Sequence, residues 1–171
     1  MSSDLPVIAL LGFGEAGSAF GRDLLDRGVT VRVYDPKVVA EPPATVTESE
    51  ADAVRGADLV LSVNSAHDAA DALAAGLAGA GPQTVWADLN TASPKAKQQL
   101  AATAGEHGIA FADIAIMAPV PGKGLSVPLL VSGPAADDVA RMLRGVGASI
   151  DVQPGDAGEA AQRKLLRSVF F

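Results

Sequence analysis

The sequence contains no cysteine. This absence excludes a disulfide framework, a thiolate metal site and a cysteine nucleophile. The two histidines, His67 and His107, have no partners at metal-ligand spacing, so no metal is expected. No combination of serine, histidine and aspartate and no pair of carboxylates marks a hydrolytic site. Chemistry that depends on a thiol, a metal or an activated serine is therefore not indicated.

Long apolar runs and runs of basic residues are missing as well. The apolar runs are much shorter than the ~20 residues of a membrane-spanning helix. No positively charged segment precedes residues 5–11, as it would in a signal peptide. The chain has 13 basic and 20 acidic residues and a net charge of −7, which disfavours nucleic acid and anionic membranes as partners. We expect a cytoplasmic protein that binds a small molecule.

Aromatic residues are also scarce, at 4% of the 171 residues. The chain is nevertheless 49% hydrophobic and only 19% charged, which excludes an intrinsically disordered polypeptide. Its length suits one domain with a full hydrophobic core. Because alanine supplies much of the apolar content, small side chains must pack closely in that core.

Short runs rich in Val, Ile and Leu alternate with Ala-rich segments that begin with helix-capping residues. The sequence predicts strands over 7–11, 29–34, 58–63, 84–88, 109–114, 129–132 and 149–152. Helices are predicted over 16–27, 47–55, 65–77, 94–107 and 134–144, and from a cap at Asp156 to the end. Unbroken apolar strands are buried on both faces, as in a parallel sheet. The predicted fold is therefore α/β, a Rossmann-type, doubly wound domain with a mostly parallel sheet.

A glycine-rich motif follows the first predicted strand and opens the first helix, which is the context that gives the pattern G-x-G-x-x-G its meaning. Its residues are Gly12, Phe13, Gly14, Glu15, Ala16 and Gly17. Gly12 would permit a tight turn, Gly14 would let the backbone approach a pyrophosphate, and Gly17 with Gly21 would let the helix pack close to the sheet. The anion would bind at the helix N-terminus, with Glu15 pointing to solvent. These six residues are the predicted cofactor-binding loop.

Asp35 ends the second predicted strand, 18 residues after Gly17. An acid at this point hydrogen-bonds the ribose of a dinucleotide and repels a 2′-phosphate, which predicts NAD(P) as the cofactor with NAD preferred. Because Lys37 follows Asp35 by two residues, NADP remains an alternative cofactor. The alternatives are that Asp35-Pro36 is a turn that only ends a strand, or that the loop binds a flavin or S-adenosylmethionine.

Four stretches together resemble the cofactor domain of the β-hydroxyacid dehydrogenase superfamily, which contains 6-phosphogluconate and 3-hydroxyisobutyrate dehydrogenases. They are residues 8–17 with 31–35, residues 58–64, the run Asp88-Leu89-Asn90-Thr91-Ala92-Ser93-Pro94, and a terminal helix with Gly158, Lys164 and Ser168. The third stretch is similar to the family's D-x-S-T-x-x-P. Its form here is typical of a less studied phosphogluconate-dehydrogenase-like branch.

The resemblance implies roles for particular residues. Lys164 corresponds to the family's acid/base, and Ser168, one turn later, would hydrogen-bond the substrate oxygen. Asn90 would contact cofactor or substrate and Thr91 the substrate, while Asn64 and Ser65 would contact the cofactor. Each has an ordinary structural alternative. Lys164 with its neighbouring arginines suits a solvated helix end, and the Asn, Ser and Thr residues suit caps and turns.

The chain departs from the family in the loop that should choose the substrate. The family reads D-A-P-V-S-G-G, whereas residues 113–124 here lack the Ser-Gly-Gly, so no substrate can be named. Lys123 in this loop is a candidate for an anionic substrate group, or else an exposed lysine. A serine, Ser168, stands where the family has an asparagine.

The end of the chain carries two of its five phenylalanines, Phe170 and Phe171. In the resembled family this position leads into a long helix and an all-helical second domain that closes the substrate cleft, often across a dimer. We therefore expect residues 1–155 to form the NAD(P)-binding domain and residues 156–171 to begin such a helix in a homodimer. This chain alone is then expected to be an incomplete enzyme. The alternative is that both aromatic rings fold back onto the domain's own sheet.

The function expected from these features is NAD(P)-dependent hydride transfer between nicotinamide and a small hydroxy acid. One alternative is an imine reductase, for which the lysine is not essential. Another is a nucleotide-sensing module without turnover, in which a lysine at position 164 would have no purpose.

Overall fold

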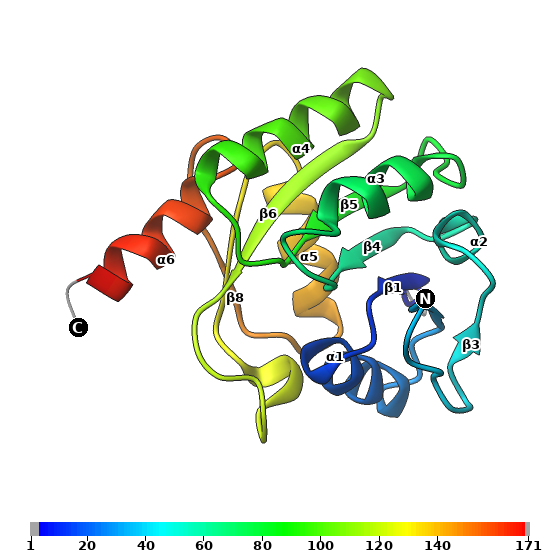
Figure 1. Ribbon diagram of the computed structural model, residues 1–171. Helices are drawn as coiled ribbons and strands as arrows, with labels where there is room; N and C mark the ends of the chain where they lie inside the picture. The colour runs from blue at the N-terminus through cyan, green and yellow to red at the C-terminus, as the bar shows by residue number, and fades with distance from the viewer. Residues whose placement is uncertain (1–3, 170–171) are drawn as a thin grey trace.

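The computed structural model describes residues 4–169, which form one eight-stranded sheet with helices on both faces (Figure 1). The strands are β1 (Ile8–Leu11), β2 (Val31–Tyr34), β3 (Thr45–Val46), β4 (Leu59–Ser62), β5 (Val85–Asp88), β6 (Ala110–Ile116), β7 (Leu129–Ser132) and β8 (Ile150–Val152). They lie in the order β3-β2-β1-β4-β5-β6-β7-β8. Strands β1 to β6 are all parallel, β7 is antiparallel to β6, and β8 is parallel to β7. The predicted Rossmann-type fold with a mostly parallel sheet is confirmed.

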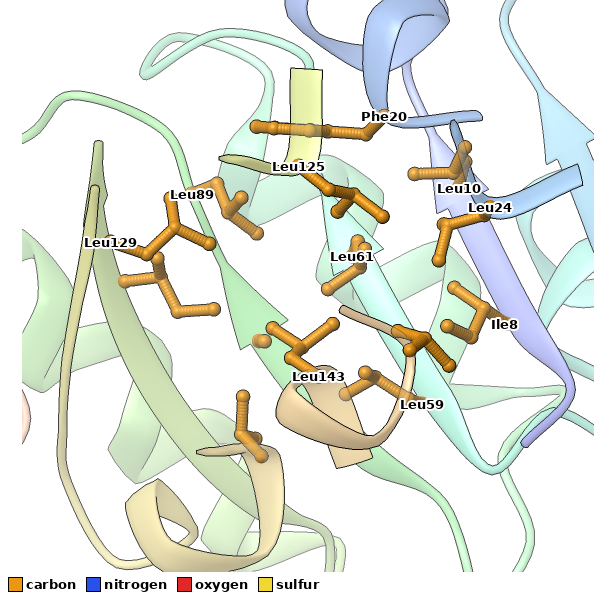
Figure 2. Close-up of a cluster of buried hydrophobic side chains, with 14 of the residues drawn as sticks. Ile8, Leu10, Phe20, Leu24, Leu59, Leu61, Leu89, Leu125, Leu129 and Leu143 are labelled. Carbon is orange, nitrogen blue, oxygen red and sulfur yellow. The ribbon is translucent and has the colours of Figure 1, made fainter. Parts of the chain in front are cut away.

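The helices divide the core into two layers. They are α1 (Glu15–Asp26), α2 (Glu50–Val54), α3 (Ala69–Leu77), α4 (Pro94–Glu106), α5 (Ala136–Gly145) and α6 (Glu159–Val169), with a 3₁₀ turn η1 (Gly124–Ser126). Helices α1 and α5 cover one face, where Phe20, Leu24 and Leu143 pack on Ile8 and Leu10 (Figure 2). Helices α2, α3 and α4 cover the other face. The central strands β1, β4, β5 and β6 thus send alternate side chains into two apolar layers, which explains their unbroken apolar runs.

Several predicted element boundaries were wrong for physical reasons. The two-residue strand β3 was missed because Thr45 and Val46 are both exposed and carry no apolar periodicity. Helix α2 begins at Glu50 rather than at residue 47, because Ser49 is the residue whose side chain accepts from the Asp52 amide. Helix α3 begins at Ala69, after a turn in which the Ser65 hydroxyl accepts from the Asp68 amide.

Asp156 does not cap α6 in the way its position suggested. The side chain is exposed, and the free amides of the helix are instead bound by buried side chains from the sheet. Beyond its first turn, α6 extends away from the body of the domain (Figure 1). Its outer residues Leu165, Leu166 and Val169 are 46%, 52% and 77% exposed. Phe170 and Phe171, on which the expectation about the chain end rests, lie outside the described residues.

Among residues 4–169, no helix has both the length and the apolar character needed to cross a membrane. The same residues contain no group of three or more potential metal ligands.

Candidate active site

The carboxyl ends of the parallel strands border a cleft with a volume of about 750 Å³, which we call the dinucleotide cleft. Most of the residues predicted to bind the cofactor line it. They are Gly12, Gly14, Glu15 and Ala16 from the glycine loop, Asp35 after β2, Asn64 and Ser65 after β4, and Asn90 after β5. Thr91, which was predicted to contact the substrate, lines the same cleft. Ligands of open α/β sheets bind at this edge, where the strand order reverses between β1 and β4. Loops far apart in the sequence therefore meet in one cleft.

The glycine loop has the geometry of an anion cradle. Gly12 has a φ of +104°, and a Cβ there would overlap the Val63 carbonyl group, so only glycine fits. At Gly14, in contrast, a Cβ would meet no atom within 4 Å. The backbone at Gly14 thus faces open space at the N-terminus of α1, as a pyrophosphate requires. Glu15 is exposed, as predicted.

One glycine has a different role from the one predicted. A Cβ on Gly17 would overlap the carbonyl group of Gly12, so Gly17 allows the helix to close on its own loop rather than on the sheet. Gly21 is the residue that brings α1 close to β1, because a Cβ there would stand 3.1 Å from Leu10 and 2.8 Å from the Phe13 ring.

Asp35 is half-buried in the wall of the cleft. One carboxylate oxygen accepts from the amides of Lys37 and Val38, at 2.8 and 3.0 Å. Asp35 therefore forms a turn after β2, as expected from the alternative in which Asp35-Pro36 only ends a strand. The other oxygen accepts from the Phe13 amide at 2.7 Å. Asp35 therefore also holds the glycine loop against β2, and this second oxygen can accept one further hydrogen bond.

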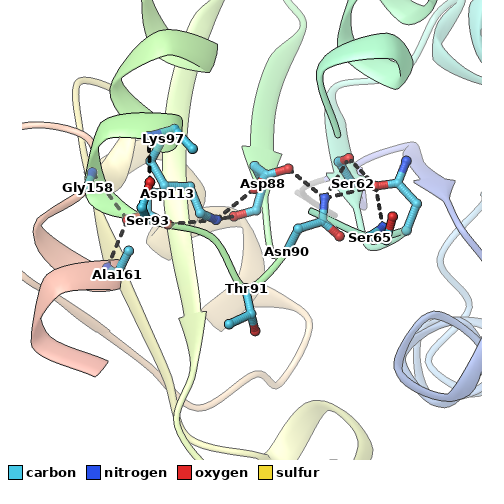
Figure 3. A network of polar contacts seen from close by, with 12 residues as sticks. Ser62, Ser65, Asp88, Asn90, Thr91, Ser93, Lys97, Asp113, Gly158 and Ala161 are labelled. Carbon is cyan, nitrogen blue, oxygen red and sulfur yellow. Dashed lines mark hydrogen bonds and ion pairs between the residues drawn. The ribbon is translucent and has the colours of Figure 1, made fainter. Parts of the chain in front are cut away.

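A polar network connects the loops after β4 and β5 (Figure 3). The side-chain amide of Asn90 donates to Asp88 and to Asn64, each at 2.8 Å. Both of its protons are then used, and its side-chain oxygen remains as an acceptor for a ligand. The Asn64 oxygen also accepts from the Ser65 amide at 3.0 Å. The Ser65 hydroxyl donates to the Asp68 side chain at 2.7 Å. Ser65 therefore also makes the local contacts expected from the alternative in which it is a capping residue.

Lys164 is brought to the edge of this cleft by α6. Its amine donates to the Thr91 hydroxyl at 3.3 Å. Burial lowers the pKa of Lys164 below its ordinary value, the positive charge of Lys97 lowers it further, and the Asp113 carboxylate partly opposes both. The local environment therefore favours a neutral amine more than solvent does.

A second cavity of about 770 Å³ lies beside the dinucleotide cleft. Lys164, Arg167 and Ser168 line it from α6, opposite residues 116–121 of the loop after β6, and Glu15 and Ala16 close its other side. The Ser168 hydroxyl donates to the Lys164 carbonyl at 3.1 Å, as an ordinary helical serine does. Lys123 is exposed and does not line this cavity, so the structure does not bring it together with Lys164.

Lys97 and Asp113 were not singled out from the sequence, yet both are buried next to the site. The Lys97 amine contacts Asp88 at 2.7 Å and Asp113 at 2.9 Å, with all three side chains at most 1% exposed. Burial raises the pKa of the Asp88 carboxyl, whereas the charge and hydrogen bond of Lys97 lower it. The signal available in the sequence was an acid within each of two apolar strands, Asp88 at the end of β5 and Asp113 in the middle of β6, because a buried acid needs a cation.

The fold, the glycine loop and the acid after β2 define an NAD(P)-binding Rossmann domain. The sequence matches the family model described as the NAD binding domain of 6-phosphogluconate dehydrogenase over residues 7–152. The chain therefore belongs to this family. Its relatives include NAD(P)-dependent oxidoreductases, and the resemblance found in the sequence is confirmed.

Solved structures agree with this assignment. A conserved hypothetical protein from Sinorhizobium meliloti 1021 is 28% identical, with a TM-score of 0.90 over 98% of this chain and 60% of that one. The 3-hydroxyisobutyrate dehydrogenase of Mycobacterium tuberculosis, solved with L-serine, is 25% identical, with a TM-score of 0.84 over 98% and 60%. An imine reductase variant from Myxococcus stipitatus, solved with NAD⁺, shares the fold at 24% identity, with a TM-score of 0.84 over 98% and 62%.

The chain spans about 60% of the length of these solved structures. A search of the curated proteins finds no match.

Proposed function

We propose that this chain is the cofactor-binding part of an NAD(P)-dependent dehydrogenase that acts on small hydroxy acids. The observation that carries the proposal is the position of Lys164. Its half-buried amine lies 3.3 Å from the Thr91 hydroxyl, where the dinucleotide cleft meets the cavity lined by α6. A nucleotide-sensing module would have no use for a lysine held in this place.

The proposed role of Lys164 is general acid/base catalysis. A bound nicotinamide ring would accept the hydride from the carbinol carbon during oxidation and return it during reduction. Lys164 in its neutral form takes the hydroxyl proton in oxidation, and in its protonated form it returns that proton in reduction. The lowered pKa of the Lys164 amine raises the neutral fraction available at a given pH. Thr91 holds the amine in place, and Asn90 offers an oxygen to the ligand.

The substrate class follows from the cavity beside Lys164. Arg167 lies three residues further along the same helix and lines the same cavity. Its guanidinium group makes a long hydrogen bond, of 3.5 Å, to the Met117 carbonyl. Its guanidinium group is therefore available to pair with a carboxylate. The opposite wall is apolar and contains Ile116, Met117 and Val120. We propose a short acid whose hydroxyl group faces Lys164 and whose carboxylate faces Arg167.

The cofactor preference follows from Asp35. Its carboxylate stands in the cleft wall, where it would repel the 2′-phosphate of NADP and bond the ribose of NAD. Lys37 lines the same cleft and is the group that would moderate the preference.

Imine reduction is the second candidate, because imine reductases share this fold. Purified chain and its Lys164→Met variant would be screened with small hydroxy acids and cyclic imines, with both NAD(H) and NADP(H). Hydroxy-acid turnover that disappears in the variant supports the proposal. Imine turnover that persists in the variant supports the second candidate. A hydroxy acid that both forms turn over at equal rates contradicts the proposed role of Lys164.

A further inference from the structure

Lys97 occupies a fully buried position in α4, between β5, β6 and the start of α6 (Figure 3). Its amine donates to the Asp88 carboxylate at 2.7 Å and to the Asp88 carbonyl at 3.0 Å. It also contacts the Asp113 carboxylate at 2.9 Å. The ammonium group thus makes two hydrogen bonds, both to Asp88, and an ion pair with Asp113 that is not a hydrogen bond. A charge this deep is retained only when all of its partners are present.

Asp113 connects this ammonium group to α6. One carboxylate oxygen accepts from the Gly158 and Ala161 amides, at 3.2 and 3.0 Å, and so caps the N-terminus of the helix. Ser132 adds a third contact by accepting from the Ala160 amide at 2.9 Å. The other Asp113 oxygen is buried and accepts no hydrogen bond from the described residues. The charge of Lys97 is therefore what compensates that oxygen.

Asp88 connects the same ammonium group to the cofactor cleft. Its second carboxylate oxygen accepts from the Asn90 side chain at 2.8 Å, and Asn90 also donates to Asn64. A continuous polar chain thus runs from Asn64, in the cleft wall, through Asn90, Asp88, Lys97 and Asp113 to the first turn of α6 (Figure 3). Lys164 lies in the second turn of that helix, directly after the capped amides.

We propose that Lys97 is a positioning residue, which ties the helix that carries Lys164 to the strand end that carries Asn90 and Thr91. The inference rests on the proposed function only for the roles of Lys164 and Asn90. Lys97 itself lines neither the dinucleotide cleft nor the larger cavity beside it. Its effect is to keep two parts of the site, contributed by β5 and α6, in one fixed relationship.

The same arrangement sets the charge around Lys164. The charged groups that face it from other elements are Lys97, Asp88 and Asp113 in the buried cluster and Glu15 across the cavity. Arg163 and Arg167 lie on its own helix. Lys97 favours the neutral Lys164 amine, and Asp113 favours the protonated one. Removing either group should therefore shift the pKa of Lys164, in opposite directions.

A purely structural role for Lys97 predicts something different. A buried cation that only stabilises the domain would, on removal, speed amide exchange throughout the sheet and its helices alike. A positioning role predicts loosening in α6 and around Asn90 and Thr91, while α1 on the opposite face keeps its protection. Exchange is therefore measured residue by residue.

The test uses NMR on the 171-residue chain with [¹³Cε]lysine and ¹⁵N labels, and it needs no substrate. Lys97→Met removes the charge and keeps the length of the side chain. Lys95→Met, at an exposed position in the same helix, is the matched control. In Asp113→Asn the side-chain oxygen can still cap the two α6 amides, but the ion pair is lost. The expected result for Lys97→Met is about tenfold or faster exchange at Ala160 and Ala161, with α1 unchanged.

The lysine titrations provide the second readout. The pKa of Lys164 is expected to rise in Lys97→Met, to fall in Asp113→Asn and to stay constant in Lys95→Met. Unchanged α6 exchange in folded Lys97→Met, or exchange that accelerates equally in α1, would overturn the inference. If Lys97→Met does not fold, Asp113→Asn decides by the same criteria. Failure of the proposed function is distinguishable, because turnover retained in Lys164→Met leaves these exchange results unaffected.

Discussion

The amine of Lys164 lies 3.3 Å from the hydroxyl of Thr91, although 73 residues separate them in the chain. This contact joins the two halves of the proposed site, one contributed by the loop after β5 and the other by α6. It forms because Asp113 and Ser132 bind the first amides of α6 and so fix where the helix leaves the sheet.

Replacement of Lys164 by Met should abolish most acid/base catalysis while the fold and cofactor binding remain. The expected loss in kcat is about 10²–10⁴-fold, the usual contribution of a positioned proton-transfer group. Lys123→Met is the control, because Lys123 does not line the cavity. Near-normal turnover of a hydroxy acid by Lys164→Met would remove Lys164 from the mechanism.

The pH dependence should differ in sign between the two directions of the reaction. Oxidation needs the neutral Lys164 amine, so its rate should rise with pH through the pKa of Lys164 and then level. Reduction needs the protonated amine, so its rate should fall over the same range. Burial and Lys97 lower this pKa, which moves both transitions below the ordinary range of lysine. Initial rates in both directions check this, and a reduction rate that increases with pH would contradict it.

Asp35 should make NADH bind more tightly than NADPH, by about 1 kcal/mol or more, as expected for a charged hydrogen bond. Asp35→Ala should narrow the difference, but it also removes the acceptor of the Phe13 amide. Asp35→Asn is therefore the better control, because it removes the charge and keeps an acceptor. Fluorescence titration with both cofactors measures the difference. Tighter binding of NADPH by the unmodified chain would show that the ribose argument is wrong.

Two glycines in one loop should respond differently to substitution. Gly14→Val should greatly weaken cofactor binding, because the valine side chain would occupy the open space that the pyrophosphate needs. The loss of stability should be small, because a Cβ at this position meets no protein atom within 4 Å. Gly12→Ala should instead destabilise the fold, since its positive φ and the Val63 carbonyl leave no room for a Cβ. Thermal unfolding and cofactor titration separate the two effects. Unchanged affinity in Gly14→Val would place any nucleotide elsewhere.

Arg167→Gln should raise the KM of an acidic substrate and leave that of its amide or ester analogue nearly unchanged. The physical reason is the loss of a charge-assisted pair with the carboxylate, which contributes about 1.5–3 kcal/mol. Arg163→Gln is the matched control on the same helix, because Arg163 lines a different cavity from Lys164. If both variants change KM equally, the effect is a general one of helix charge.

Local patterns were sufficient for the fold and for the position of the glycine loop between β1 and α1. The apolar runs, the Ser93 cap with Pro94 and the glycines identified most elements, because each depends on neighbours in the chain. The same logic identified Asp35, whose spacing from the glycine loop is a property of one βαβ unit. The prediction missed exposed β3, which carries no local signal. It also misplaced the cap of α6, because distant side chains bind the first amides there and Asp156 does not.

Only the tertiary structure could decide how the distant parts of the site meet. Lys97 looks like any polar residue of an amphipathic helix, and its burial follows only from the way α4 packs over the ends of β5 and β6. Lys123 and Lys164 were both candidates in the sequence, and only the path of α6 and the position of η1 separate them. Hydrogen bonds and periodicity act between near neighbours, whereas a site formed by four loops depends on which strands adjoin in the sheet. The order of the strands depends on how the whole core packs, so no single segment of the sequence determines it.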